Sequence, residues 1–108
     1  MDDTAGLDTT LSSPVRLRIA AYLAGCDTAD FAAVQAYCQM SASNLSKQVT
    51  TLSAVGYVEV RKVASGRYPK TTLALTPEGR DALTGHVARL RHIAEEGVAN
   101  GEQHLTKP

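Results

Sequence analysis

The stretch GRYPKTTLALTPEGR, residues 66–80, combines a turn, a strand and a helix start in a short length of chain. Gly66 follows a serine, a pair that is typical of a turn. Leu73 and Leu75 alternate with other residues, as in a half-buried strand. Thr76-Pro77-Glu78 supplies a capping hydroxyl, a proline suited to the first helical turn and an acid near the positive helix end. The stretch therefore predicts the second strand of a β-hairpin that leads directly into a helix.

The residues before the turn provide the partner strand. Residues 57–61 alternate between apolar and charged side chains, with Val58 and Val60 on one face. Such alternation is typical of a strand with one buried side. Residues 71–75 would return beside it, so that residues 57–75 form a hairpin.

The helix that begins at Thr76 is predicted to be long. It is expected to run to about Glu96 and to stop at Gly97, leaving residues 98–108 as a flexible tail. At ~1.5 Å per residue its roughly 20 residues span ~30 Å, more than a small domain can cover. We therefore expect it to pair with the same helix of a second subunit, together with residues 7–12; a monomer with a protruding helix is the alternative. The predicted dimer contacts are Leu7, Leu11, Leu83, Val87, Leu90, Ile93 and Ala94.

Three helices are predicted before the hairpin. The first begins at Ser13-Pro14 and ends at Gly25, and the second begins at Asp30. The third begins at Ser41 and stops at Gly56. Its inward stripe consists of Leu45, Val49, Leu52 and Val55. The order of helix, helix, helix, hairpin and long helix predicts a mainly α fold with a small β-hairpin wing, a winged helix-turn-helix with a C-terminal dimerisation helix.

Length and charge limit the classes of protein that fit. The 108 residues suffice for one domain, with a core over about residues 11–96 and a flexible segment at residues 1–6. The formal net charge is zero, but residues 41–80 hold six cations and two anions, whereas residues 1–40 hold two cations and five anions. A polyanion would therefore meet the middle third of the chain.

The signals for a cellular compartment are simple. The N-terminus is acidic and lacks the apolar segment of a secretory signal, and no apolar run reaches the ~18 residues that a membrane span needs. Cys26 and Cys38 alone make a poor disulfide framework. We expect a cytoplasmic protein that does not associate with membranes.

Two segments together resemble a known family. SNLSKQVTTLSAVGYVEVRK (residues 43–62) and GRYPKTTLALTPEGRDAL (residues 66–83) resemble the winged-helix DNA-binding domains of bacterial transcriptional regulators, in particular the small stand-alone group akin to the MarR and ArsR types. The resemblance extends from about Pro14 to His92. It implies a homodimeric regulator, expected to be a repressor, that reads a pseudo-palindromic operator in double-stranded DNA. Gln39 departs from the family, which usually has a glycine in this turn.

The helix that begins at Ser41 carries short polar side chains near its N-terminal end, the end that a recognition helix presents to the major groove. Asn44 can pair with adenine through two hydrogen bonds, and Lys47 suits guanine or a phosphate. In the wing, Arg67 can enter a narrow minor groove, and Tyr68 either binds a phosphate or covers the hairpin. A solvated helix face and a charge-protected edge strand are the alternative interpretations. The predicted DNA-binding set is Ser41, Ser43, Asn44, Ser46, Lys47, Thr50, Arg61, Arg67, Tyr68 and Lys70, with Arg61 and Lys70 on phosphates.

Other functions fit the sequence less well. An enzyme is not indicated, because the serines lack the context of a nucleophile elbow and no phosphate-binding glycine loop occurs. A metal- or thiol-responsive sensor would use His86, His92, Glu95 and Glu96 or the two cysteines, at spacings too loose to indicate a site. A winged helix that contacts only proteins stays open as an alternative. No metal or cofactor is predicted, and the effector, if there is one, is unknown.

Overall fold

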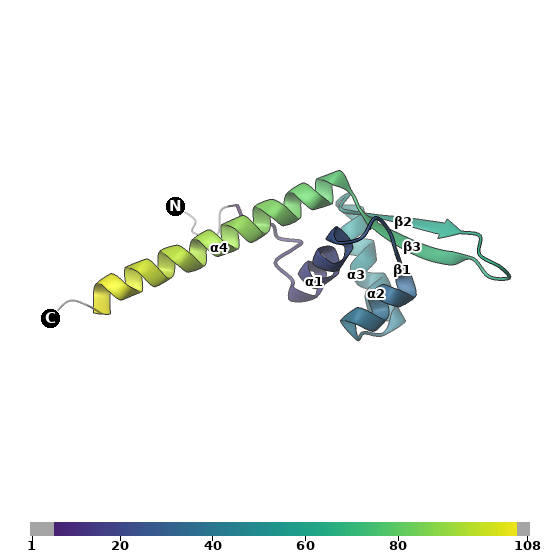
Figure 1. Cartoon of the computed structure of the whole chain (residues 1–108), viewed down its shortest axis with the longest axis horizontal. Helices are drawn as coiled ribbons and strands as arrows, with labels where there is room; N and C mark the ends of the chain where they lie inside the picture. Colours follow the sequence, from purple (N-terminus) through teal and green to yellow (C-terminus); the bar gives the residue numbers. More distant parts are fainter. Residues whose placement is uncertain (1–5, 106–108) are drawn as a thin grey trace.

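The structure, a computed structural model, describes residues 6–105, which form a helical head with a long arm on each side (Figure 1). The hairpin and the last helix are the two arms, and they give the molecule extents of 72 × 24 × 21 Å. The predicted order of elements and the winged-helix arrangement are confirmed. Residues 1–5 and 106–108, which were expected to be flexible, lie outside the described range. The elements are α1 (Pro14–Ala24), β1 (Ala29–Asp30), α2 (Phe31–Cys38), α3 (Ala42–Ala54), β2 (Val58–Val63), β3 (Lys70–Leu75) and α4 (Pro77–Leu105).

The wing belongs to a three-stranded antiparallel sheet rather than to a lone hairpin. β3 lies between β1 and β2, so Leu73 has Ala29 on one side and Val60 on the other. The sequence did not predict β1, because two residues are too few to show the alternation of a strand. Since α2 begins directly after β1, this short strand ties the base of the wing to the helical head.

One apolar core joins the three helices of the head to the sheet and to the segment before α1. Leu11, in that segment, is 1% exposed. A hydrogen bond of 2.9 Å from the Leu11 amide to the Asp8 carboxylate closes the turn that directs it inward. Leu11 therefore has no surface left for a second subunit, and its burial removes it from the predicted dimer contacts. The largest fully buried side chains are Leu11, Ile19, Leu23, Val34, Leu45, Leu52 and Leu73.

The starts of α1 and α3 confirm the predicted caps, and the start of α2 corrects one. Ser13 and Ser41 each accept a hydrogen bond from a backbone amide three residues further on. Asp30 occupies the N-cap position of α2, but its side chain makes no capping hydrogen bond. Its carboxylate lies 3.3 Å from Lys70 Nζ instead. The Asp30 side chain therefore forms an ion pair with the wing and does not cap α2.

α4 is longer than predicted. It continues through Gly97 to Leu105, so residues 98–105 are helical rather than a flexible tail. A glycine weakens a helix by about 1 kcal/mol, but it does not end one by itself. At ~1.5 Å per residue the 29 residues of α4 extend well beyond the head (Figure 1). Neither α4 nor any other helix of residues 6–105 combines the length and the apolar character that a membrane crossing needs.

Thr76 and Arg80, at the end of the stretch quoted first, anchor α4 to the head. The Thr76 hydroxyl accepts a hydrogen bond from the Gly79 amide at 2.9 Å and donates one to the Gly56 carbonyl at 2.6 Å. Arg80 donates to the Ala24 carbonyl at 3.1 Å, at the C-terminal end of α1. The base of α4 is thus bound both to α1 and to the turn between α3 and β2.

The turn between α2 and α3 holds Gln39 in the left-handed conformation, with φ 53° and ψ 53°. A Cβ atom strains this conformation by about 1 kcal/mol, whereas glycine adopts it freely. Gln39→Gly is therefore expected to raise the free energy of unfolding by about 1 kcal/mol in a urea titration. Gln39→Ala keeps the Cβ atom and should give no such gain. An equal gain in both variants would contradict strain as the cause.

Candidate nucleic-acid interface

α3 has a buried stripe, an outward face and two polar flanks. At 3.6 residues per turn, Ser43, Lys47 and Thr50 lie on the side away from the core, and all three are exposed. Ser46 lies on the flank toward the wing, and Asn44 lies on the flank toward α1. The helix therefore offers a polar outer surface with a single cation. The buried stripe consists of Leu45, Val49 and Leu52.

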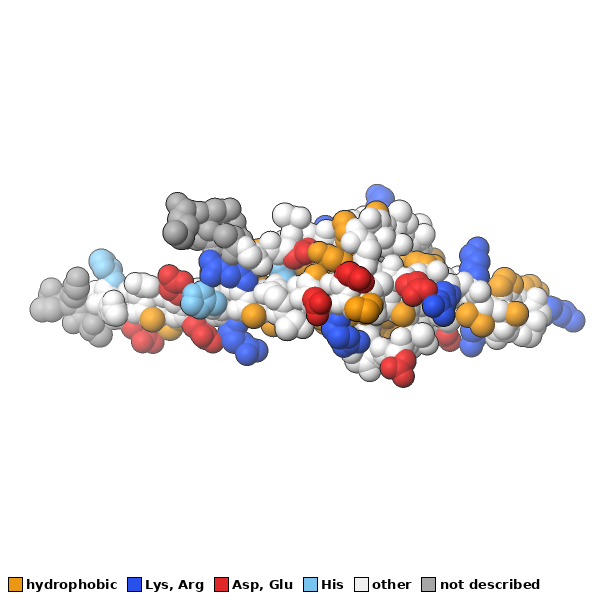
Figure 2. All heavy atoms as spheres, turned by 90° about the horizontal axis from the view of Figure 1, so that it is seen from above, with side chains coloured by type: hydrophobic (Ala, Val, Ile, Leu, Met, Phe, Trp, Pro, Cys, Tyr) orange, Lys and Arg blue, Asp and Glu red, His pale blue; other side chains and the backbone are white. Residues whose placement is uncertain are grey.

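The wing ends in an exposed turn that carries a cation. Gly66 in this turn has φ +59°, a conformation that glycine adopts without strain. Arg67 and Tyr68 follow it, and Tyr68 is 74% exposed, so little of its ring covers the hairpin. Figure 2 shows lysine and arginine side chains at the free end of the wing. The tip thus holds a guanidinium and a phenol away from the body of the protein.

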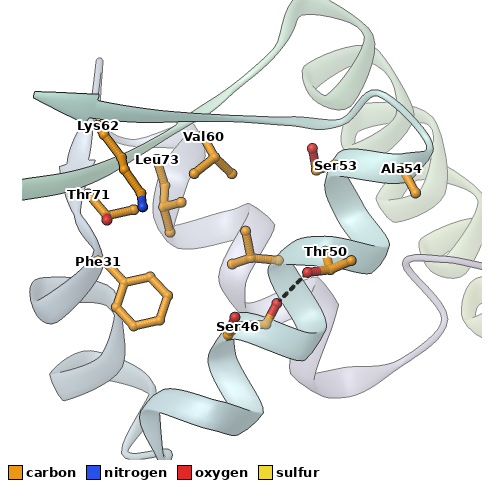
Figure 3. Close-up of a pocket in the computed structure, with 10 residues that line it drawn as sticks. Phe31, Ser46, Thr50, Ser53, Ala54, Val60, Lys62, Thr71 and Leu73 are labelled. Atoms are coloured by element: carbon orange, nitrogen blue, oxygen red, sulfur yellow. Dashed lines mark hydrogen bonds between the residues drawn. The ribbon is translucent and has the colours of Figure 1, made fainter.

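A hollow of about 590 Å³ separates α3 from the wing (Figure 3). α3 contributes Ser46 and Thr50 to its wall, and the sheet contributes Val60, Lys62 and Thr71. Figure 3 shows the Lys62 amino group extending from the wing into this space. α3 and the wing therefore border one concave surface. The full lining is Phe31, Ser46, Val49, Thr50, Ser53, Ala54, Val60, Lys62, Thr71 and Leu73.

Two residues predicted to hold phosphates, Arg61 and Lys70, have acidic neighbours. Arg61 Nε lies 2.7 Å from Glu59 Oε1, and Lys70 Nζ lies 3.3 Å from Asp30 Oδ2. Both pairs are exposed, and exposed ion pairs contribute only about 0–1 kcal/mol, so a phosphate can replace either carboxylate. Since side chains alternate along a strand, Arg61 lies on the sheet face opposite to Lys62. Lys62 is therefore the β2 cation that faces α3.

All ten residues of the predicted DNA-binding set are exposed, six on α3 or at its N-cap and four on the wing. Lys62 was not in this set, although it continues the alternation of Val58 and Val60 and could have been placed on their face. Arg16 and Gln48, which connect α1 to the Asn44 side chain, were also not in it. No sequence signal marks that connection, because it depends on how α1 packs on α3.

The segment before α1 is bound to α4 and to the base of the wing. The Asp8 amide donates to His86 Nδ1 at 2.9 Å, and His86 is only 2% exposed. The Tyr57 hydroxyl donates to the Asp8 carboxylate, and this bond raises the pKa of Tyr57. His86 is therefore engaged in packing. Within residues 6–105, no three or more His, Cys, Asp or Glu side chains are grouped to hold a metal ion.

The two cysteines are half-buried and pack against the core. Burial raises the pKa of the Cys38 thiol, against the smaller opposing effect of Arg18. A raised pKa disfavours the thiolate that a redox sensor needs. The environment of Cys38 thus favours a packing role.

α4 carries apolar residues that its own chain leaves uncovered. Val87 is 38% exposed and Leu90 is 39% exposed. Ala94 and Val98 continue the same side of the helix, and Val98 is 61% exposed. We call these four residues the α4 stripe. The other predicted contacts on the surface, Leu7, Leu83 and Ile93, are half-buried, and Leu83 packs against the core.

The fold and the concave surface define a class of protein. A helical head with an exposed polar helix beside a cationic hairpin is the architecture of winged helix-turn-helix DNA-binding proteins. A family model described as a winged helix DNA-binding domain matches residues 15–94. The chain therefore belongs to the winged helix DNA-binding domain family. A comparison with curated proteins found no match.

Solved structures of transcriptional regulators share this fold. A transcriptional regulator homologue from Pyrococcus horikoshii OT3 is 26% identical, with a TM-score of 0.77 over 81% of this chain and 86% of that chain. ZitR, a zinc-responsive MarR family member from Lactococcus lactis, is 12% identical, with a TM-score of 0.63 over 95% of this chain and 68% of that one. Bacillus subtilis PadR, solved in complex with operator DNA, is 16% identical, with a TM-score of 0.60 over 67% and 45%. The resemblance to the winged-helix DNA-binding domains of transcriptional regulators is confirmed, and a MarR family member shares the fold.

Proposed function

We propose that this protein is a sequence-specific transcriptional repressor that binds double-stranded DNA as a homodimer. In this proposal α3 enters the major groove and the wing lies at the minor groove. The observation that carries it is the concave surface between α3 and the wing, which is lined by Ser46 and Thr50 of α3 and by Lys62 of the wing together with apolar side chains. The fold shared with PadR, which was solved with operator DNA, supports DNA binding by this protein as well.

The outer face of α3 has the chemistry that base edges require. The hydroxyls of Ser43 and Ser46 can each donate or accept a hydrogen bond, and their short side chains let the helix approach the bases closely. The Thr50 hydroxyl donates to the Ser46 carbonyl at 2.9 Å and can accept a bond from a base. Lys47 reaches further and can contact guanine or a phosphate. The Ser41 hydroxyl accepts a hydrogen bond from the Asn44 backbone amide at 3.1 Å. Ser41 therefore holds the N-terminal end of α3 in place.

The wing supplies phosphate contacts and a side chain for the minor groove. Arg67 stands on the exposed turn, where a guanidinium can enter a narrow minor groove. Lys62 faces α3 and can therefore contact the phosphates of a DNA strand that passes between α3 and the wing. Lys70 and Arg61 can exchange their exposed carboxylate partners for phosphates. Tyr68, exposed at the tip, can donate its hydroxyl to a phosphate.

The homodimer follows from the part of α4 that projects beyond the head (Figure 1). An isolated helix shorter than about 12–15 residues is marginal in water. This part also contains Gly97 and Gly101, and each glycine weakens a helix by about 1 kcal/mol. Burial of the α4 stripe against the same stripe of a second copy would supply the missing stability. Two-fold symmetry would then present two α3 helices to a pseudo-palindromic operator.

Repression is the activity that needs the fewest further contacts. A dimer seated on an operator excludes other proteins from that DNA, and it needs no surface for recruiting them. We therefore assign repression rather than activation to this protein.

Lys47→Ala and Arg67→Ala test the two parts of the interface separately. Lys47 lies on the outer face of α3 and Arg67 lies on the wing tip. Each substitution therefore removes a cation that we place in a different groove of the DNA. Each is expected to weaken binding of a duplex from the protein's own promoter region by about tenfold or more, without changing the melting temperature. Fluorescence anisotropy measures the affinity.

Arg91→Ala is the matched control for these variants. It removes the same charge from an exposed position on α4, away from α3 and the wing. Because Arg91 lies one turn from Val87 of the α4 stripe, sedimentation first checks that this variant is still a dimer. We expect it to bind the duplex like the unaltered protein. Unchanged affinity in both Lys47→Ala and Arg67→Ala would show that DNA meets another face.

A further inference from the structure

Asn44 stands at the end of a chain of side-chain hydrogen bonds. Arg16 of α1 donates from Nη1 to Gln48 Oε1 at 3.0 Å. Gln48, one turn after Asn44 on α3, donates from Nε2 to Asn44 Oδ1 at 3.2 Å. Arg16 is itself held by a bond of 2.8 Å from Nε to the Thr10 carbonyl. We call the bonds from Arg16 through Gln48 to Asn44 the amide relay.

The direction of the amide relay is set by the guanidinium group, which has donors only. An amide can present its oxygen or its nitrogen, but only the oxygen of Gln48 can accept from Arg16. The amide nitrogen of Gln48 then faces Asn44, and Asn44 accepts with its oxygen. The NH₂ group of Asn44, an exposed residue, is left to face away from Gln48.

We infer that Arg16 and Gln48 are positioning residues that fix the Asn44 amide with its donor toward DNA, an inference that rests on the proposed function. A donor suits an acceptor on a base edge, such as N7 of adenine. A two-bond contact with adenine needs the oxygen and the nitrogen of the amide to face the base together. The amide oxygen has two lone pairs, so it can accept from adenine N6 and from Gln48 at once. The amide relay thus presets the Asn44 amide for adenine.

The burial of the two positioning residues makes the orientation persistent. Arg16 and Gln48 are both half-buried, whereas Asn44 is exposed. Bonds with an ionised donor are roughly twice as strong as neutral ones, so the link from Arg16 to Gln48 is the firmer of the two. Without Arg16, the Gln48 amide can turn over and present its oxygen to Asn44. A residue of α1 thereby influences base recognition without touching the DNA.

NMR of the Asn44 side-chain NH₂ group tests the amide relay in the free protein. Gln48→Met has a similar length and no hydrogen-bonding group, and Arg16→Met removes the donor that sets the direction. Both are expected to shift the Asn44 NH₂ signal while the backbone amide signals of the rest of α3 stay in place. Arg18→Met is the control, since Arg18 lies on the same helix but stacks over the Tyr37 ring at 5.0 Å. An unmoved Asn44 signal in either Gln48→Met or Arg16→Met would overturn the inference.

Selection of bound duplexes from a randomised double-stranded DNA library tests the base preference. Asn44→Ala identifies the position in each half-site that Asn44 reads. At that position the unaltered protein is expected to favour adenine by about tenfold. Gln48→Met is expected to weaken this preference, because the Asn44 amide is then free to turn over, and to leave the other positions unchanged.

The outcomes separate the inference from the function on which it rests. A base other than adenine in the unaltered protein, or an unchanged preference in Gln48→Met, would overturn the role of the amide relay. Failure of every one of these proteins to enrich any sequence would contradict the proposed function itself. The NMR result on the free protein would still decide whether the relay orients Asn44.

Discussion

Leu90→Asp is expected to convert the proposed homodimer into a monomer and to weaken operator binding by about 100-fold or more. Leu90 is 39% exposed within the α4 stripe, so a carboxylate there leaves the core of the chain intact. In the dimer the same carboxylate would be buried without a partner, which is costly. Two linked half-site contacts gain roughly 10²–10⁴ in affinity through effective concentration, and separated subunits lose that gain. Sedimentation at tens of micromolar and anisotropy with operator DNA measure the two effects.

Ala88→Asp is the matched control for the dimer. Ala88 is exposed on the same part of α4 but lies outside the α4 stripe. It introduces the same charge, and we expect it to remain a dimer with unchanged affinity. A monomeric unaltered protein at this concentration, or an intact dimer in Leu90→Asp, would refute the role of the α4 stripe.

Gly79→Ala is expected to lower the free energy of unfolding by about 3 kcal/mol, at the upper end of the cost of overpacking. A Cβ atom at Gly79 would overlap the Tyr57 carbonyl oxygen and lie 2.8 Å from Leu75 Cδ1. The Tyr57 carbonyl accepts a hydrogen bond from the Thr76 amide at 2.9 Å, so it cannot move without loosening the anchor of α4. The glycine in the stretch that ends at Arg80 is therefore required by a close backbone approach.

Urea unfolding followed by circular dichroism measures this effect. Gly85→Ala is the control, because a Cβ atom at Gly85 of the same helix meets nothing within 4 Å. It should raise the stability by about 0.5–1 kcal/mol, the usual gain from replacing a glycine inside a helix. If Gly79→Ala were as stable as the unaltered protein, the approach of α4 to Tyr57 would be wrong.

Local chemistry accounts for most of the order of elements. Ser13 and Ser41 cap helices as predicted, and both strands of the hairpin begin and end within two residues of the prediction. These signals lie between neighbours in the chain, where a short window of sequence contains all the interacting groups. The same holds for the outer face of α3, on which helical spacing places Ser43 and Lys47.

The differences from prediction have more than one physical cause. Gly97 is a local stop signal, yet α4 continues past it, because a glycine weakens a helix without ending it. β1 forms because β3, distant in the sequence, offers an edge to Ala29 and Asp30, which carry no strand signal of their own. Leu11 was assigned to a partner subunit, because its sequence context does not show that the turn closed by Asp8 directs it into the core.

In the candidate interface, too, some features could be predicted from the sequence and others could not. Strand alternation was sufficient to place Lys62 on the face of the hollow, although it was not used. The amide relay could not be predicted from the sequence, because Arg16 and Gln48 meet only once α1 has packed on α3. Residue types in a single chain predict what a face can bind. The orientation of a given side-chain amide can be predicted only when the contacts of its neighbours are known.

The salt dependence of DNA binding tests most directly whether the concave surface between α3 and the wing holds phosphates. Lys62 lines that surface, and Lys47, Arg67 and Lys70 are exposed on the two elements that border it. A dimer is therefore expected to neutralise roughly 8 phosphates. The logarithm of the affinity for an operator-length duplex is then expected to fall against the logarithm of the salt concentration with a slope of about −7. A slope near zero would contradict the account.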